Sequence, residues 1–142
     1  MYLLNQVNQA VRSRLEQELR PLGLTGIQYT VLSIVQTRDG ISSAELSRRF
    51  FVTPQTMNEI VAGLERRGLL MREESAHNRR VLTARRTAAG AEALARADRI
   101  ADAIEADAFG HLSDADHAAL RRLLRVQLDA TRAARARPSK SA

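Results

Sequence analysis

Residues 41–87 decide the fold of this chain, and they read ISSAELSRRFFVTPQTMNEIVAGLERRGLLMREESAHNRRVLTARRT. A short helix is expected over 44–50, because Ser42 and Glu45 stand three residues apart, which is the spacing of a capping box. A second helix is expected to start at Thr53, and a proline follows at the first helical position, where a missing N–H costs nothing. The stretch therefore begins with two short helices joined by a tight turn.

The second half of the stretch predicts a β-hairpin. Gly68 is expected to end the second short helix. The runs 69–73 and 79–86 flank a polar turn, which is typical of two antiparallel strands. Upstream, apolar residues at helical spacing predict a further helix over 25–36. Three helices followed by a hairpin over 25–87 form the pattern of a winged helix-turn-helix, whose second short helix enters the DNA major groove.

Long amphipathic segments flank this block. Apolar residues at three- and four-residue steps predict a helix over 2–19, an alanine-rich helix over 87–112 and a last helix from residue 113. A polar tail that is expected to be disordered follows over 136–142. The fold class is therefore mostly α with a small β-hairpin wing, in a single domain. Several apolar residues of the outer helices have too little of their own chain to cover them, so other helices or a second subunit must do so. They are Leu3, Leu4, Val7, Leu120, Leu124 and Leu128.

Composition narrows the class of function. The 142 residues suit one domain, and the absence of cysteine excludes disulfides, thiol redox sensing and cysteine-ligated metals. The net charge is +6, and residues 41–87 carry nine arginines against five acids, which favours a polyanionic partner. Aromatic residues make up only 4% of the chain, so a nucleic acid is not expected to be bound by base stacking.

No segment of the sequence has the pattern of a signal peptide or of a membrane span. The first residues lack the basic and apolar regions of a signal peptide. The longest uncharged stretch, 21–37, is shorter than the ~20 apolar residues that a membrane span needs. A cytoplasmic protein is therefore expected.

An ordered set of motifs gives the chain a family resemblance. The motifs are Gln28-Tyr29-x-Val31-Leu32, Ala44-Glu45-Leu46, Val52-Thr53-Pro54-Gln55-Thr56-Met57 and Leu64-Glu65-Arg66-Arg67-Gly68-Leu69-Leu70-x-Arg72, followed by Arg79-Arg80 and Thr87-x-x-Gly90. In this order they resemble the MarR (multiple antibiotic resistance regulator) family. The resemblance covers nearly the whole chain.

The resemblance implies a homodimer that regulates transcription. Helices over 1–20 and 88–135 would interlock two subunits. Each subunit would present the winged part, 25–87, to one half of a pseudo-palindromic operator in double-stranded DNA. Many members of the family repress neighbouring genes and release DNA when a small molecule binds. A small-molecule effector is therefore expected near Tyr29, whose side chain has an apolar body and a polar tip.

The residues expected to contact DNA fall into two groups. Amide, hydroxyl and carboxylate side chains on the second short helix can read base edges in the major groove. They are Thr53, Gln55, Thr56, Asn58 and Glu59. Arginines beside the groove can neutralise phosphates or enter the minor groove. They are Arg79 and Arg80 in the hairpin and Arg48 on the first short helix.

Other functions fit the sequence less well. It contains no nucleophile–base set, glycine-rich phosphate loop or metal-binding histidine pair, so no enzyme activity, cofactor or metal site is expected. His111 and His117 have acidic neighbours but suit surface positions at helix ends better than a metal site. The alternative is a winged-helix protein–protein interaction module without specific DNA binding. Glu59 and Asn78 favour that alternative, because the family often carries a basic residue and an aspartate at these positions.

Overall fold

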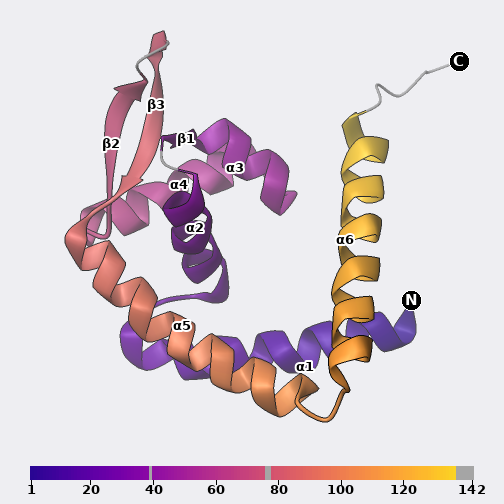
Figure 1. Ribbon diagram of the computed structural model, residues 1–142. Helices are drawn as coiled ribbons and strands as arrows, with labels where there is room; N and C mark the ends of the chain where they lie inside the picture. The colour runs from indigo at the N-terminus through magenta and orange to yellow at the C-terminus, as the bar shows by residue number, and fades with distance from the viewer. Residues whose placement is uncertain (39, 76–77, 137–142) are drawn as a thin grey trace, which may run out of the picture. The chain divides into compact units, whose positions relative to one another are not determined.

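The computed structural model describes residues 1–38, 40–75 and 78–136, without the side chains of 78–80, 135 and 136. The chain divides into two compact units, Met1–Ile104 and Glu105–Ala142. Figure 1 shows the elements of both units in chain order. The first unit holds the winged helix-turn-helix, and the second holds the last helix.

The first unit follows the order expected from the sequence. Its elements are α1 (Tyr2–Leu19), the 3₁₀ turn η1 (Arg20–Leu22), α2 (Gly26–Thr37), β1 (Ile41–Ser42), α3 (Ser43–Phe50), α4 (Pro54–Arg66), β2 (Leu70–Ser75), β3 (Asn78–Arg86) and most of α5 (Ala88–Phe109). The strands form one antiparallel sheet in the order β1-β3-β2, with Ile41 opposite Ala84 and Leu70 opposite Arg86. The expected hairpin is therefore the larger part of a three-stranded wing.

Local capping explains where the helices of the winged part begin. Thr25 and Gln28 form a capping box at the start of α2, and Ser42 and Glu45 form another at the start of α3. Thr53 caps α4 with its side-chain hydroxyl. Each of these helices therefore starts where a side-chain acceptor satisfies backbone N–H groups that no helical carbonyl can reach.

A single apolar core joins the helices of the winged part to the sheet. Leu32 of α2, Leu46 of α3 and the α4 residues Met57, Val61 and Leu64 are fully buried within it. On α4 these buried residues recur at three- and four-residue steps, so they occupy one face of the helix. The core thus fixes which face of α4 remains in solvent.

Thr87 joins the end of α4 to the start of α5. Its hydroxyl donates to the Gly68 carbonyl at 2.6 Å and accepts from the Gly90 N–H at 3.0 Å, while its own N–H bonds to the Leu69 carbonyl at 3.3 Å. A Cβ atom on Gly90 would collide with that Leu69 carbonyl oxygen. Only glycine therefore allows the two backbone segments to approach so closely.

The second unit contains the end of α5 and the whole of α6 (Asp114–Ala136). Helix α5 ends at Phe109, three residues before the expected end, because Gly110 begins a turn whose backbone leaves no room for a Cβ atom. The Ser113 hydroxyl caps α6 and accepts from the Asp116 N–H at 3.2 Å. Helix α6 ends one residue beyond the boundary expected from the sequence.

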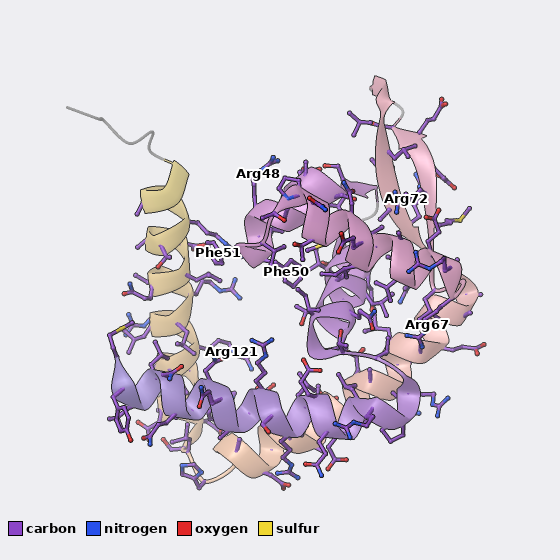
Figure 2. All side chains as sticks on the ribbon, turned by 180° about the vertical axis from the view of Figure 1, so that it is seen from behind. Arg48, Phe50, Phe51, Arg67, Arg72 and Arg121 are labelled. Atoms are coloured by element: carbon purple, nitrogen blue, oxygen red, sulfur yellow. The ribbon has the colours of Figure 1, made fainter. Side chains whose placement is uncertain are left out.

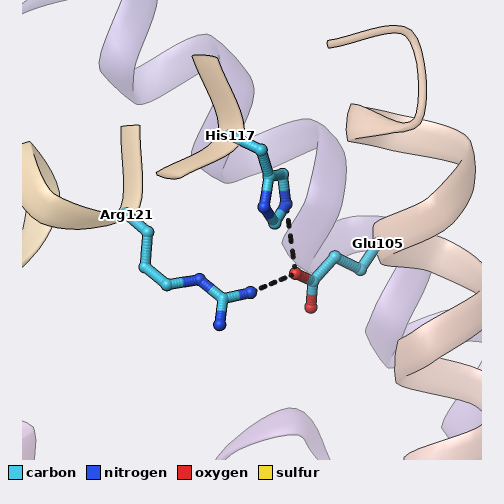
Figure 3. A network of polar contacts seen from close by, with 3 residues as sticks. All are labelled: Glu105, His117 and Arg121. Atoms are coloured by element: carbon cyan, nitrogen blue, oxygen red, sulfur yellow. Dashed lines mark hydrogen bonds and ion pairs between the residues drawn. The ribbon is translucent and has the colours of Figure 1, made fainter. Parts of the chain in front are cut away.

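Three polar side chains link the end of α5 to the first turns of α6 (Figure 3). Glu105 Oε1 lies 3.3 Å from Arg121 Nη2 and 3.5 Å from His117 Nε2. The side chains are all at least one-third exposed, so water screens their attraction. The cluster therefore orients the turn more than it stabilises it.

Candidate nucleic-acid interface

The helix expected to read DNA, α4, has one buried and one exposed face. Its apolar residues are buried in the core of the winged part. The cap of α4 and the polar residues of its first turns are exposed. They are the residues predicted to contact base edges: Thr53, Gln55, Thr56, Asn58 and Glu59. The structure therefore brings these five side chains together on the solvent side of the winged part.

Thr53 has a structural role at the start of this surface. Its hydroxyl accepts a hydrogen bond from the Thr56 N–H at 3.1 Å and lies 2.8 Å from the Thr56 hydroxyl. This cap holds the first turn of α4 in place. The first turn of a helix carries partial positive charge and unpaired N–H groups, which favour an anion such as a DNA phosphate.

Gln55 and Glu59 interact one helical turn apart. The Gln55 amide nitrogen donates to a Glu59 carboxylate oxygen at 3.5 Å, the upper limit for a hydrogen bond. So long a contact restrains the glutamine weakly, and the amide can exchange it for a base edge. Glu59 offers only acceptor oxygens, so among the base edges in the major groove it suits the amino groups of cytosine or adenine.

Of the three arginines predicted to touch DNA, the structure describes the side chain of one. Arg48 is exposed on α3 (Figure 2). Arg79 and Arg80 belong to β3, but their side chains lie outside the described residues. Arg85 forms an ion pair with Glu73 of the neighbouring strand at 2.8 Å, which holds its guanidinium group on the sheet.

Arg72 of the wing braces α4, a contact that the sequence analysis missed. Its Nε atom lies 3.1 Å from a carboxylate oxygen of Glu65, and its Nη2 atom donates to the Asn58 backbone carbonyl at 3.5 Å. The side chain is 23% exposed, so this ion pair is partly shielded from water. Strand β2 and helix α4 are therefore joined by polar contacts in addition to the core (Figure 2).

A second missed contact lies at the other end of α4. Arg67 donates to the Gly23 carbonyl at 2.6 Å and to the Leu22 carbonyl at 3.0 Å. These carbonyls belong to the connection between α1 and α2, where Gly23 adopts the left-handed conformation. The guanidinium group of Arg67 therefore fastens the end of α4 to this connection (Figure 2).

Tyr29, the residue predicted to lie near an effector, is on α2 and half-buried. Its hydroxyl donates a hydrogen bond of 3.1 Å to a carboxylate oxygen of Asp98 on α5. The contact ties the winged part to the long helix. It also places a carboxylate beside the tyrosine tip, which opposes the approach of an anionic ligand group at that point.

The apolar residues predicted to lie at a subunit interface are exposed for the most part. Leu3, Leu4 and Val7 on α1 are 74%, 53% and 49% exposed, and Leu124 and Leu128 on α6 are 48% and 39% exposed. Leu120 is half-buried. Exposed apolar residues clustered on a helix mark surfaces that bind another macromolecule.

Two further features bear on function. In the part of the chain that the structure describes, no group of three or more His, Asp or Glu side chains converges where it could hold a metal ion. Over 1–38, 40–75 and 78–136, no helix is both long enough and apolar enough to cross a membrane.

Sequence comparisons place these features among known proteins. A profile of the MarR family matches residues 22–81, which cover most of the winged part. The HTH-type transcriptional repressor Rv2887 of Mycobacterium tuberculosis is 35% identical over 123 residues, which are 87% of this chain and 88% of the relative. The transcriptional regulator HosA of Escherichia coli is 31% identical over 126 residues, which are 89% of this chain and 92% of the relative.

Solved structures agree with the sequence comparisons. The crystal structure of the Mycobacterium tuberculosis MarR family protein Rv2887 in complex with salicylic acid matches with a TM-score of 0.71 and 34% identity, over 89% of this chain and 93% of that one. The structure of CouR from Rhodococcus jostii RHA1 bound to p-coumaroyl-CoA has the same fold, with a TM-score of 0.83 and 24% identity over 89% of this chain and 90% of that one. The chain therefore belongs to the MarR family and is a DNA-binding transcriptional regulator rather than an enzyme.

Proposed function

We propose that this regulator is a homodimeric repressor that reads a pseudo-palindromic operator with α4 and releases it when a small molecule binds. The observation that carries the proposal is the division of α4 into a fully buried apolar face and an exposed polar face. Gln55 and Asn58 on the exposed face have amide groups that can form paired hydrogen bonds with adenine. Arg48, with Arg79 and Arg80 of the hairpin, supplies the phosphate contacts that position the helix.

The homodimer is supported by the exposed apolar residues of α1 and α6. A two-fold symmetric dimer covers the same patch on both subunits. It would also place two copies of α4 on one face of the DNA, at half-sites separated by a helical turn or a multiple of it. The residues that we assign to the interface are Leu3, Leu4, Val7, Leu120, Leu124 and Leu128.

An aromatic acid is the effector class that we propose. Crystal structures of the relative Rv2887 contain salicylic acid and p-aminosalicylic acid. Tyr29 stays a predicted contact of the effector. Because its hydroxyl donates to Asp98, we expect it to meet the ring or a neutral group of the effector rather than its carboxylate.

The test of DNA reading compares two kinds of variant on two kinds of DNA. Gln55→Ala or Asn58→Ala removes a base contact without changing charge, so each should weaken binding to the operator by about 1–3 kcal/mol and leave scrambled DNA almost unaffected. Arg48→Ala or Arg80→Ala removes a phosphate contact, so both DNAs should be bound more weakly and the salt dependence should fall by about one unit per lost contact.

Titrations of the upstream intergenic DNA at three salt concentrations give the answer. If the amide variants weaken both DNAs equally, α4 does not read bases. If no variant changes binding to either DNA, the protein–protein interaction module becomes the better reading of this winged helix.

A further inference from the structure

Phe51 lies in the turn between α3 and α4 and has an uncommon backbone conformation. Its φ and ψ angles are 56° and 31°, which is the left-handed region. In the part of the chain that the structure describes, the other residues with positive φ are glycines, namely Gly23, Gly40 and Gly68. A Cβ atom disfavours this region, so helices that end in this way usually do so at glycine. The turn would therefore form more readily with glycine at position 51.

Burial of the ring does not account for this conformation. Phe51 is 39% exposed. Its neighbours Phe50 and Val52 are partly buried and pack against the core of the winged part, whereas Phe51 does not belong to that cluster. A single exposed apolar side chain is ordinary on a protein surface. One that also disfavours its own backbone conformation needs a further reason, and such residues cluster at functional sites.

The surroundings of Phe51 favour a polyanion. Arg48 is exposed on the preceding turn of α3 (Figure 2). Thr53 caps α4 two residues later, so the partial positive charge at the start of that helix lies close by. The centre of an interface between protein chains is depleted in charged residues. A ring between an arginine and a helix N-terminus therefore suits DNA better than the apolar face of a second copy.

The position of Phe51 also fits contact with the bases. In a helix-turn-helix, the second helix lies in the major groove, and its first residues contact the base edges. Phe51 directly precedes the first turn of α4, so its ring belongs to the end of the helix that reaches the bases. Thymine presents an apolar C5 methyl group in the major groove, and phenylalanine is among the side chains that contact this group.

We propose that Phe51 reads a thymine in each half-site of the operator through the C5 methyl group of that base. The proposal rests on the proposed function, which it deepens by naming a base and an atom that the protein distinguishes. The polar side chains of α4 suit the hydrogen-bonding groups of base edges. Phe51 adds recognition of a group that forms no hydrogen bond.

The test replaces thymine by uracil, which lacks the methyl group and keeps every hydrogen-bonding group of the base. Footprinting on the upstream intergenic DNA first locates the protected site. Each pair of thymines related by the symmetry of that site is then replaced by deoxyuridine. At one such pair, wild type should lose about fourfold in affinity per half-site, or about fifteenfold in all, which is the scale of one buried methyl group.

Two variants remove the ring and leave residues that accept the left-handed conformation, Phe51→Gly and Phe51→Asn. Both should bind the thymine operator at least about fifteenfold more weakly than wild type, and both should bind the thymine and uracil operators equally. Their melting temperatures should stay close to that of wild type, because the exposed ring adds little to the core. Arg48→Ala is the control. It should weaken both operators alike and keep the preference for thymine.

The proposal is wrong if wild type binds the thymine and uracil operators with equal affinity at every position. It is also wrong if the Phe51 variants weaken both operators by the same factor, because Phe51 would then act through the structure or through the DNA backbone. Specific binding of wild type to the unmodified site tests the proposed function by itself. If that binding is absent, both proposals fail. If it is present without a preference for thymine, only the reading by Phe51 fails.

Discussion

Tyr29 and Asp98 are joined by a hydrogen bond of 3.1 Å between residues that stand 69 positions apart in the sequence. The phenol belongs to α2 of the winged part, and the carboxylate belongs to the long helix α5. The contact is half-buried, and its acceptor is a carboxylate oxygen. It therefore helps to set the angle at which the DNA-reading part leaves the long helix.

Tyr29→Phe removes this hydrogen bond and leaves the ring in place. We expect the free energy of unfolding to fall by about 1 kcal/mol, the usual net value of one hydrogen bond in a folded protein. Tyr2→Phe is the matched control, because Tyr2 is 74% exposed and its hydroxyl contacts only its own helix neighbour Gln6 among the described residues. Urea unfolding of both variants gives the comparison. Equal effects at the two positions would show that the contact with Asp98 adds nothing to stability.

Gly90→Ala should be strongly destabilising although it adds only one methyl group. The new Cβ atom would collide with the Leu69 carbonyl, which cannot move without breaking the junction between α4 and α5. Overpacking of this kind costs about 1–3 kcal/mol. At Gly63, inside α4, a Cβ atom would make only ordinary contacts, so Gly63→Ala should stabilise by about 0.5–1 kcal/mol. Thermal unfolding should move in opposite directions for the two variants.

Glu45 should make the stability of α3 depend on pH. The Ser42 hydroxyl and N–H donate to its carboxylate and, with Arg48 and Arg49, hold its pKa below the ordinary value of 4.5. A lowered pKa in the folded state means that the carboxylate stabilises the fold above the ordinary value and ceases to do so as the pH falls through the lowered one. Glu45→Gln keeps the cap but not the charge.

The melting temperature of Glu45→Gln should therefore lie below that of wild type at about pH 7, and the gap should narrow as the pH falls below the ordinary pKa of 4.5. A gap that stays constant over this range would mean that the charge of Glu45 is not involved.

A charge on the exposed apolar surface should separate the proposed dimer. Leu4→Glu on α1 and Leu124→Glu on α6 each place a carboxylate where we expect an apolar contact with the second subunit. Sedimentation velocity should show monomer or a mixture for both variants. Asn5→Glu and Gln127→Glu, exposed neighbours on the same helices, should sediment as wild type does. A stable dimer of both leucine variants would place the interface elsewhere.

The helix starts of the winged part could be predicted because each depends on neighbouring residues. Thr53 caps α4 with its own hydroxyl, and the two residues of the capping box of α3, Ser42 and Glu45, stand only three positions apart in the sequence. The capping box of Thr25 and Gln28 has the same spacing and could have been recognised in the same way. The exposed polar face of α4 followed from the helical period of its apolar residues.

The contacts that orient these helices could not be predicted in this way. Arg67 bonds to carbonyls 44 and 45 residues earlier in the chain, and Tyr29 bonds to an acid 69 residues later. No periodicity links such positions, because the fold alone brings them together.

Arg72 links the two parts of the winged helix that we propose to contact DNA, the wing and α4. Its ion pair with Glu65 and the apolar core that α4 shares with the sheet hold the base of the wing against α4. If α4 and the wing both contact DNA as proposed, the protein sets the distance between these two contacts. One inserted base pair displaces the second contact by ~3.4 Å and rotates it about the duplex axis. We therefore expect each half-site to tolerate base changes one at a time but not a change in its length.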